Sequence, residues 1–144
     1  MNRRVVVTGM GAVTPVGNSV GESWAALCSG QSGIGPITKF DAAAFDTRIA
    51  GELKDFDPLR YVTKRERRRY DDFIIFALAA AEMAVADAAL PVNGPEADRT
   101  GVIIASAIGG LETIDKEKEA LLAGGPKKMS VFAIPAVLAN LAAG

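Results

Sequence analysis

The feature that most constrains the fold is a run of residues, 73–81, that is apolar on every side of a helix. A surface helix carries an apolar stripe on one side only, whereas a helix that is apolar all round has to be covered on all sides. The run belongs to a predicted helix that starts with a capping box, Thr63 and Glu66, and continues to about Ala89, where Pro91 ends it. The sequence therefore predicts a fold with more than one layer around this helix.

Two other short apolar runs, residues 4–9 and 101–105, predict β-strands that are buried on both faces. The second run is followed by Ile108, which stands between small residues, and then by Gly109 and Gly110. Paired glycines at a strand end indicate that the backbone approaches another group closely. Because ligands bind beyond the carboxyl ends of strands in open α/β sheets, Ile108 is a candidate pocket wall. A tight strand-to-helix turn with a core isoleucine fits the same pattern.

Length, composition and charge bound the class of protein. A chain of 144 residues, 49% of them apolar, fits one globular domain with a core of its own. Its formal net charge of -1 argues against nucleic-acid binding by the chain as a whole. The single cysteine leaves no internal disulfide and suits a reducing compartment. No uncharged stretch can span a bilayer, and the valine run at residues 5–7 is too short for a signal-peptide core. We therefore expect a cytoplasmic protein without membrane insertion.

The sequence contains no histidine. Imidazole general-base chemistry, imidazole metal ligation and Cys–His relays are therefore not available within it, and we expect no metal site. Cys28 lies near the end of a predicted helix over residues 20–29, which starts at a capping box of Ser19 and Glu22. It falls on the apolar stripe of that helix and lies at its C-terminal end, which is the negative end of the helix dipole. That end disfavours a thiolate, whereas an activated nucleophile needs its thiolate to be stabilised. We predict a structural role for Cys28.

Gly9 and Gly11 supply the first two positions of a dinucleotide-binding loop. Such a loop needs Gly-x-Gly-x-x-Gly at the start of a helix and an acidic residue about 20 positions further on. Thr14 occupies the third glycine position, Pro15 follows it, and Asp41 lies too far along the chain. The pattern therefore argues against a nucleotide site, and we expect no cofactor.

The remaining segments predict short elements around these. Residues 30–58 are rich in glycine, proline and aspartate, which predicts a surface excursion with one short strand or hairpin near residues 48–53. Residues 111–123 predict an exposed amphipathic helix, and residues 127–134 predict a loop or short turn. A last helix is expected over residues 135–143, because proline suits the first position of a helix.

Five basic residues crowd the start of the predicted long helix: Lys64, Arg65, Arg67, Arg68 and Arg69. The helix dipole opposes cations at this end, at a cost of roughly a few tenths of a kcal/mol each, and a partner of negative charge explains that cost. The alternative is a solvated face in which Arg67 pairs with Asp71 and Arg68 pairs with Asp72 at i,i+4 spacing. Since these pairs leave three basic residues uncompensated, we favour the anionic partner.

The order of motifs along the chain resembles the opening of the β-ketoacyl-[acyl-carrier-protein] synthases, in particular the type II elongating enzymes. The resemblance rests on segments that follow in the family's order: Val5-Val6-Val7-Thr8-Gly9-Met10-Gly11-Ala12-Val13-Thr14-Pro15-Val16-Gly17-Asn18, the Trp24 helix, Gly30-Gln31-Ser32-Gly33-Ile34, Phe40-Asp41, residues 64–72, Ser106-Ala107-Ile108-Gly109-Gly110 and Gly124-Gly125-Pro126-Lys127-Lys128. It covers the whole chain and about the first third of the family's length.

The resemblance implies an α/β fold of the thiolase-like type, with two related halves in a layered αβαβα arrangement and with residues 1–144 as an incomplete N-terminal domain. It also implies a decarboxylative Claisen condensation, in which a cysteine takes an acyl group from one carrier protein and two histidines assist decarboxylation of a malonyl group on a second. The family's nucleophile and histidines follow the segments matched here, so the resemblance implies no catalytic residue, metal or cofactor in this chain. It further implies a cytoplasmic homodimer that acts with an acidic acyl carrier protein.

Three features of the family carry over residue by residue. Ile108 matches the isoleucine at the mouth of the acyl pocket, whose rotamer helps to gate chain length. Four basic residues match the helix start that contacts the acidic carrier protein: Lys64, Arg65, Arg68 and Arg69. Phe132, Ala133 and Ile134 match a segment near the dimer interface that reaches towards the acyl pocket of the partner subunit. Ala133 is smaller than the aromatic residue that the family often has there.

Two functions from different classes fit this resemblance. The first is the N-terminal part of a condensing enzyme that elongates fatty acyl chains, an acyltransferase that is inactive as the 144-residue chain alone. The second is a non-catalytic module of the same ancestry that binds carrier protein or dimerises. A longer reading frame with a cysteine and two histidines favours the first function, and a stop after Gly144 favours the second.

Overall fold

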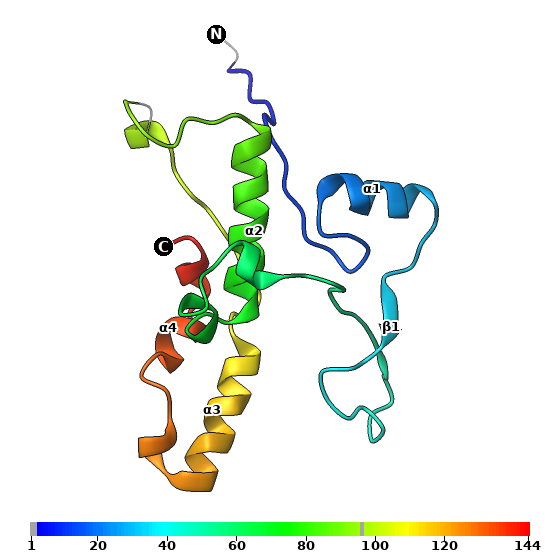
Figure 1. Ribbon diagram of the computed structural model, residues 1–144, viewed down its shortest axis with the longest axis vertical. Helices are drawn as coiled ribbons and strands as arrows, with labels where there is room; N and C mark the ends of the chain where they lie inside the picture. The colour runs from blue at the N-terminus through cyan, green and yellow to red at the C-terminus, as the bar shows by residue number, and fades with distance from the viewer. Residues whose placement is uncertain (1–2, 96) are drawn as a thin grey trace. The chain divides into compact units, whose positions relative to one another are not determined.

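The computed structural model describes residues 3–95 and 97–144, and its elements are labelled in Figure 1. The α-helices of these residues are α1 (Val20–Cys28), α2 (Asp72–Asp87), α3 (Leu111–Gly124) and α4 (Ala133–Val137). Strands β1 (Ile34–Pro36) and β2 (Ile49–Gly51) pair with each other. Short 3₁₀ turns cover Pro58–Arg60, Glu66–Arg68, Ala97–Arg99, Pro126–Lys128 and Ala139–Ala142.

The chain divides into two compact units. The first unit contains residues 3–56 and Ala80–Leu90, and the second contains Asp57–Ala79 and the described residues from Pro91 onward. The first half of α2 therefore belongs to the second unit, and its last half belongs to the first.

In the first unit, helix α1 starts where its capping residues predict. Ser19 Oγ accepts a hydrogen bond from Glu22 N at 3.2 Å, while Glu22 Oε2 accepts one from Asn18 N at 2.8 Å, one residue earlier than a regular capping box requires. The buried residues of α1 are Ser23 and Ala26. The helix packs through these small residues because the Ser23 hydroxyl hydrogen-bonds in the turn before it, at 3.2 Å to Gly17 O.

The apolar stripe predicted for α1 is not buried. Trp24 is 68% exposed, and Leu27 and Cys28 are exposed as well. Within the described residues, most of this stripe is therefore left uncovered, and only its first residue, Val20, is half-buried. Cys28 is the last residue of α1, one residue before the end expected at Ser29.

The hairpin expected within residues 30–58 is present. In the antiparallel ladder, Ile34 faces Gly51 and Pro36 faces Ile49. Just after β2, the Glu52 carboxylate accepts hydrogen bonds from the backbone N and the hydroxyl of Thr38, at 3.0 and 2.6 Å, which ties the loop after β1 to the residue after β2.

The glycines near the N-terminus pack against the last half of α2. A Cβ on Gly9 would overlap the carbonyl oxygen of Ala84, and one on Gly11 would overlap that of Ala80. Between them, Met10 N donates a hydrogen bond to the Asp87 carboxylate at 2.9 Å. These two glycines therefore allow the backbone to lie directly on α2. This packing explains the spacing of Gly9 and Gly11.

The two apolar runs predicted as buried strands form no strand in the described chain. Residues 4–9 and 101–105 lie outside helices and strands and are not paired with another strand, and Val5 is 92% and Ile103 97% exposed. An extended segment becomes a strand only when a neighbouring strand takes up its backbone N–H and C=O groups. Residues 3–95 and 97–144 offer these runs no such neighbour, so the prediction of two strands is wrong here for lack of a pairing partner.

The long helix predicted from residue 63 to residue 89 is interrupted. The predicted capping box is confirmed: Glu66 Oε2 accepts a hydrogen bond from Thr63 N at 2.8 Å, and Glu66 N donates one to Thr63 Oγ1 at 3.3 Å. It starts only the 3₁₀ turn Glu66–Arg68, and α2 begins separately at Asp72. Asp71 Oδ1 accepts from Phe73 N at 3.4 Å at this new start. The side chain of Asp71 thus replaces the helix bond that a continuous helix would make.

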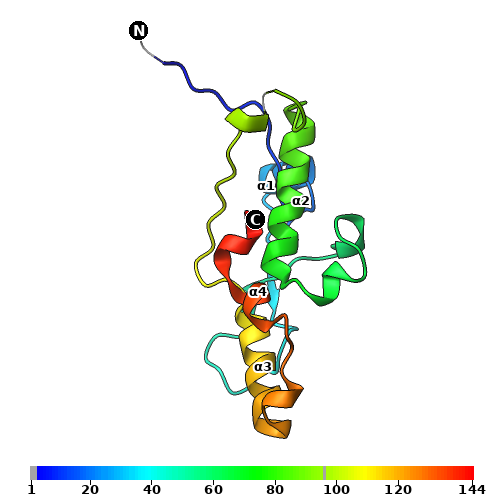
Figure 2. The same cartoon turned by 90° about the vertical axis from the view of Figure 1, so that its left-hand side faces the viewer.

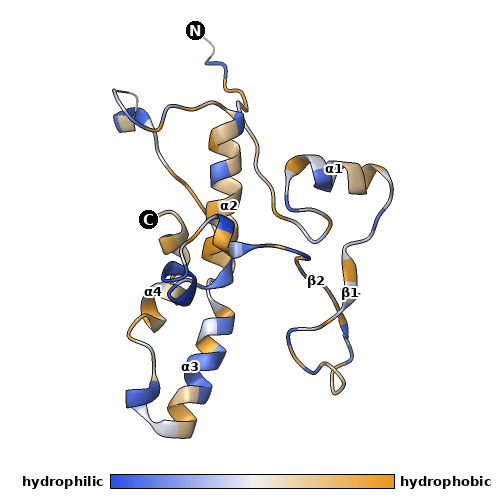
Figure 3. Ribbon diagram, viewed as in Figure 1, coloured by the Kyte–Doolittle hydropathy of each residue, from blue (hydrophilic) through white to orange (hydrophobic). Residues whose placement is uncertain are grey.

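Helix α2 provides the most buried residues of the second unit. Ile74, Ile75 and Ala79 are buried, and Ile75 is fully so. Figure 3 shows that hydrophobic residues predominate along α2, whereas much of α3 is hydrophilic. Most other residues of α2 are half-buried, and Glu82, Ala86 and Asp87 are exposed, so the complete cover that its composition predicts is not reached within the described residues.

Helix α3 begins at the predicted residue and ends one residue later than predicted, and α4 lies against it in the second unit (Figure 2). The close backbone approach predicted at the paired glycines is confirmed, because Gly110 N donates to Val137 O at 3.1 Å. Gly109 has a φ of +77°, and a Cβ there would overlap the same carbonyl. This bond takes the Val137 carbonyl away from the helix, so the helix predicted over residues 135–143 is split at Leu138 into α4 and the turn Ala139–Ala142.

A substitution at Gly11 tests the packing of backbone on α2. We expect Gly11→Ala to lower the free energy of unfolding by about 1–3 kcal/mol, because the added methyl group overlaps helix backbone. Gly21→Ala is the matched control, since its Cβ meets nothing within 4 Å and alanine favours a helix by about 1 kcal/mol over glycine. Chemical denaturation of both variants measures the difference. A Gly11→Ala chain as stable as the unsubstituted chain contradicts the close approach.

Candidate functional site

The basic segment, residues 64–69, is held as a compact turn by its own backbone. Arg67 N donates to Thr63 O at 2.9 Å, and Arg69 N donates to Glu66 O at 2.8 Å. Because this turn is separate from α2, the basic residues do not lie at the positive end of a long helix. The argument from the dipole of a long helix is therefore wrong, since a single 3₁₀ turn aligns too few peptide groups to build that dipole.

The acidic residue inside the basic segment is kept in its ionised form. The pKa of Glu66 lies below its ordinary value, first because Thr63 N donates to the carboxylate, then because the Thr63 hydroxyl does, and last because Arg69 is close. Glu66 therefore anchors the turn and stays negatively charged at neutral pH.

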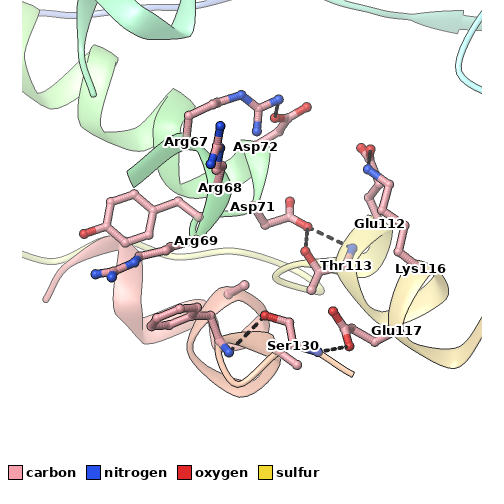
Figure 4. Close-up of a pocket in the computed structure, with 14 residues that line it drawn as sticks. Arg67, Arg68, Arg69, Asp71, Asp72, Glu112, Thr113, Lys116, Glu117 and Ser130 are labelled. Carbon is pink, nitrogen blue, oxygen red and sulfur yellow. Dashed lines mark hydrogen bonds and ion pairs between the residues drawn. The ribbon is translucent and has the colours of Figure 1, made fainter. Parts of the chain in front are cut away.

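The carboxylates that follow the basic segment have different partners. Arg67 pairs with Asp72, with a distance of 2.9 Å between Nη2 and Oδ1, and not with Asp71 as the i,i+4 spacing predicts. Asp71 Oδ2 instead accepts hydrogen bonds from the backbone N and the hydroxyl of Thr113 in α3, at 3.0 and 2.7 Å (Figure 4). The predicted Arg67–Asp71 pair is wrong because a neutral hydroxyl and a backbone amide from a distant helix take the Asp71 carboxylate.

The basic segment and the start of α3 border a first hollow of about 210 Å³. Its lining has mixed charge, with Arg67, Arg68 and Arg69 on one side and Glu112, Lys116 and Glu117 on the other (Figure 4). Lys116 is already paired with Glu112, and Glu117 accepts from Ser130 N at 2.8 Å. These bonds satisfy part of the α3 side, and Arg67 is itself paired with Asp72, so Arg68 and Arg69 contribute the positive charge that can act on a ligand.

A second hollow, of about 380 Å³, gathers the predicted docking residues. It is lined by Lys64, Arg65, Arg68, Arg69 and Phe132. The Arg69 guanidinium lies over the Phe132 ring, 4.3 Å from the ring centroid. Such a cation–π contact stabilises by about 0.5–1 kcal/mol at an exposed site. Four cations around one aromatic ring form a surface that suits an acidic partner with an apolar group beside its negative charges.

The other predicted site residues lie outside this group. Ile108 is 63% exposed and lines neither of these two hollows. The loop around it is held by a hydrogen bond from Gly109 N to Ser106 Oγ, at 3.0 Å. Ala133 lines the first hollow, whereas Ile134 is exposed and lines neither.

Among residues 3–95 and 97–144, no helix has both the length and the hydrophobicity needed to cross a membrane. In the same part of the chain, no group of three or more His, Cys, Asp or Glu side chains is placed to hold a metal ion.

Comparison with known proteins shows the family. The sequence model described as "Beta-ketoacyl synthase, N-terminal domain" matches residues 2–144. The 3-oxoacyl-[acyl-carrier-protein] synthase 2 of Coxiella burnetii is 47% identical over 142 residues, and that of Vibrio cholerae is 49% identical over 142 residues. Each match covers 99% of this chain and 34% of the relative. The chain thus spans about a third of the length of these relatives.

Solved structures agree with that result. The ishigamide ketosynthase/chain length factor superposes with a TM-score of 0.82 at 32% identity, covering 99% of this chain and 36% of the other. A type II PKS acyl-carrier protein in complex with its ketosynthase bound to the hexaketide gives 0.81 at 30% identity, covering 100% of this chain and 39% of the other. The chain belongs to the β-ketoacyl synthase family and has the α/β, thiolase-like fold of that family.

Titration of Glu66 tests how the basic segment is anchored. Thr63→Val removes the hydroxyl bond and keeps the backbone bond, so the pKa of Glu66 should rise part of the way to its ordinary value. Nuclear magnetic resonance of the carboxyl carbon measures this. Glu52 is the internal control, because its pKa is lowered chiefly by the Thr38 hydroxyl and should not change.

The same variant predicts the pH dependence of stability. A folded-state pKa below the unfolded one gives stabilisation above the unfolded pKa, near 4.3, and this stabilisation is lost as the pH falls through the folded pKa. Wild type should therefore be more stable than Thr63→Val at neutral pH by the contribution of Glu66. That contribution should vanish in acid. A difference that grows in acid contradicts this sign.

Proposed function

We propose that this chain is the N-terminal part of a 3-oxoacyl-[acyl-carrier-protein] synthase. The complete enzyme would elongate fatty acyl chains by decarboxylative Claisen condensation with malonyl carrier protein, in the cytoplasm and as a homodimer. Residues 1–144 would form an incomplete N-terminal domain of the thiolase-like fold. The curated relatives support this assignment, since those of 47–49% identity are all 3-oxoacyl-[acyl-carrier-protein] synthases 2.

The observation that carries the proposal is the second hollow, which brings all four predicted docking residues around one aromatic ring. Lys64, Arg65 and Arg68 are exposed, so their charges can act on an approaching protein. An acidic acyl carrier protein is the partner of matching charge, and complementary charge speeds association and sets the orientation of the partner. One solved neighbour is a ketosynthase in complex with an acyl-carrier protein.

In the complete enzyme, this chain would supply binding residues and the rest of the protein would supply the reacting groups. Residues 64–69 would receive the carrier protein, Ile108 would gate the acyl pocket, and Phe132, Ala133 and Ile134 would belong to the segment near the dimer interface. The acyl group would be held by a cysteine outside this chain, because Cys28 lies at the end of α1 and lines neither hollow. Decarboxylation and stabilisation of the developing negative charge would need histidines, and residues 1–144 contain none.

Charge reversal tests the docking surface. In the complete enzyme, Arg65→Glu with Arg68→Glu should weaken carrier-protein binding and reduce its dependence on salt, because two attractive charges become repulsive. Lys54→Glu with Lys118→Glu is the matched control, since it changes the net charge equally at two exposed residues that do not line the hollow. Binding is measured by surface plasmon resonance at several salt concentrations, and circular dichroism checks folding. Equal binding by wild type and the Arg65/Arg68 variant shows a solvated face without a docking role.

The 144-residue chain alone should give no condensation product, because it contains no histidine and its cysteine lies outside the site. The assay supplies acyl and malonyl carrier proteins and detects ketoacyl product by mass spectrometry, with the complete enzyme as positive control. Product from the chain alone refutes this prediction. A complete enzyme that binds carrier protein without forming product supports instead a non-catalytic docking module.

A further inference from the structure

Arg69 differs from the other basic residues around the second hollow. Lys64, Arg65 and Arg68 are exposed, whereas Arg69 is half-buried. Its guanidinium lies over the ring of Phe132, with 4.3 Å to the ring centroid. A docking residue needs only a positive charge that a partner can reach. Half-burial and stacking on a ring are not needed for that, so the placement of Arg69 indicates a second role.

Phe132 lies directly before α4 and bonds to it. Its carbonyl accepts the first bond of that helix, from Ala136 N at 2.9 Å, and its own N donates to Ser130 Oγ at 3.1 Å. The helix has only 5 residues, so few bonds of its own fix the direction of the ring. The ring is 36% exposed, and the Arg69 guanidinium lies over one of its faces. The stacking contact is therefore placed to decide how the ring is turned.

We propose that Arg69 is a positioning residue for Phe132 and that, through the ring, it helps to determine the length of acyl chain that the enzyme accepts. The proposal rests on the proposed function, in which the Phe132 segment reaches towards an acyl pocket. Arginine is suited to the role because its guanidinium is planar and stacks on an aromatic face, whereas the lysine ammonium is a compact point charge. Charge and stacking can therefore be separated by one conservative substitution.

The experiment uses four single variants and one double variant of the complete enzyme. Arg69→Lys keeps the charge and loses the planar face, and Phe132→Leu removes the ring. Phe132→Tyr keeps the ring as a rescue. Arg60→Lys is the matched control, since it makes the same change at an exposed arginine that lies over another ring, that of Tyr61, and lines neither hollow. Three quantities are measured for each variant: the distribution of product chain lengths, and the KM and kcat for acyl carrier protein.

Arg69→Lys and Phe132→Leu should each change the ratio of long to short products by about two- to fivefold, the range that corresponds to one cation–π contact. The KM for the carrier protein should stay within about twofold in Arg69→Lys, because the charge remains. Phe132→Tyr and Arg60→Lys should keep the wild-type distribution. The double variant of Arg69→Lys and Phe132→Leu should change the ratio no more than either single variant, since both remove the same contact.

A measurement without turnover separates this inference from the proposed function. The amide of Ala136, which donates to the Phe132 carbonyl, should exchange hydrogen faster in Arg69→Lys and Phe132→Leu than in Arg60→Lys. An active wild type whose product lengths and Ala136 exchange do not respond to Arg69→Lys overturns the role of Arg69 and leaves the proposed function standing. A wild type without condensing activity contradicts the proposed function, and the exchange rates then still decide whether Arg69 positions Phe132.

Discussion

The second unit depends on the carboxylate of Asp71. This half-buried side chain accepts two hydrogen bonds from Thr113 at the start of α3 and one from Phe73 at the start of α2. A carboxylate that loses water on burial has to be given donors in return, and these three bonds supply them. The start of α3 comes close because Gly110 has no side chain, and a Cβ there would lie 3.0 Å from the carboxylate. By joining α2 and α3 just after the basic segment, Asp71 gives the first hollow its shape.

Backbone hydrogen bonding sets the limit on what this chain can form. Residues 4–9 and 101–105 have the composition of buried strands, yet Val5 and Ile103 are almost fully exposed and unpaired. The chain spans about a third of the length of its curated relatives. Under the proposed function, the remaining length would supply the neighbouring strands and the cover for α2. The apolar pattern would then describe a sheet that these residues complete only together with more chain.

Local signals predicted much of the structure correctly. The cap of Ser19 starts α1, the box of Thr63 and Glu66 starts a turn, and α3 starts at the expected residue. Each of these depends on residues a few positions apart, so the sequence contains the whole interaction. The predictions failed where a distant group intervened. Asp71 bonds to a residue 42 positions away instead of pairing with Arg67, and the Val137 carbonyl bonds to Gly110 instead of continuing the helix. Neither partner leaves a periodic signal near the residue it affects.

For the candidate site, too, some features follow from the sequence and others only from the tertiary structure. The sequence by itself determined the cluster of basic residues, the paired glycines that need a close backbone approach, and the order of motifs that places the chain in the β-ketoacyl synthase family. Only the tertiary structure decided that Phe132 joins the basic residues around one hollow and that Arg69 stacks on its ring. Composition and spacing specify caps, turns and charges, because these depend on neighbouring residues. The contact between Arg69 and Phe132 depends on the path of the chain through α2, α3 and α4, and that path is set by packing and by the bonds of Asp71 and Val137.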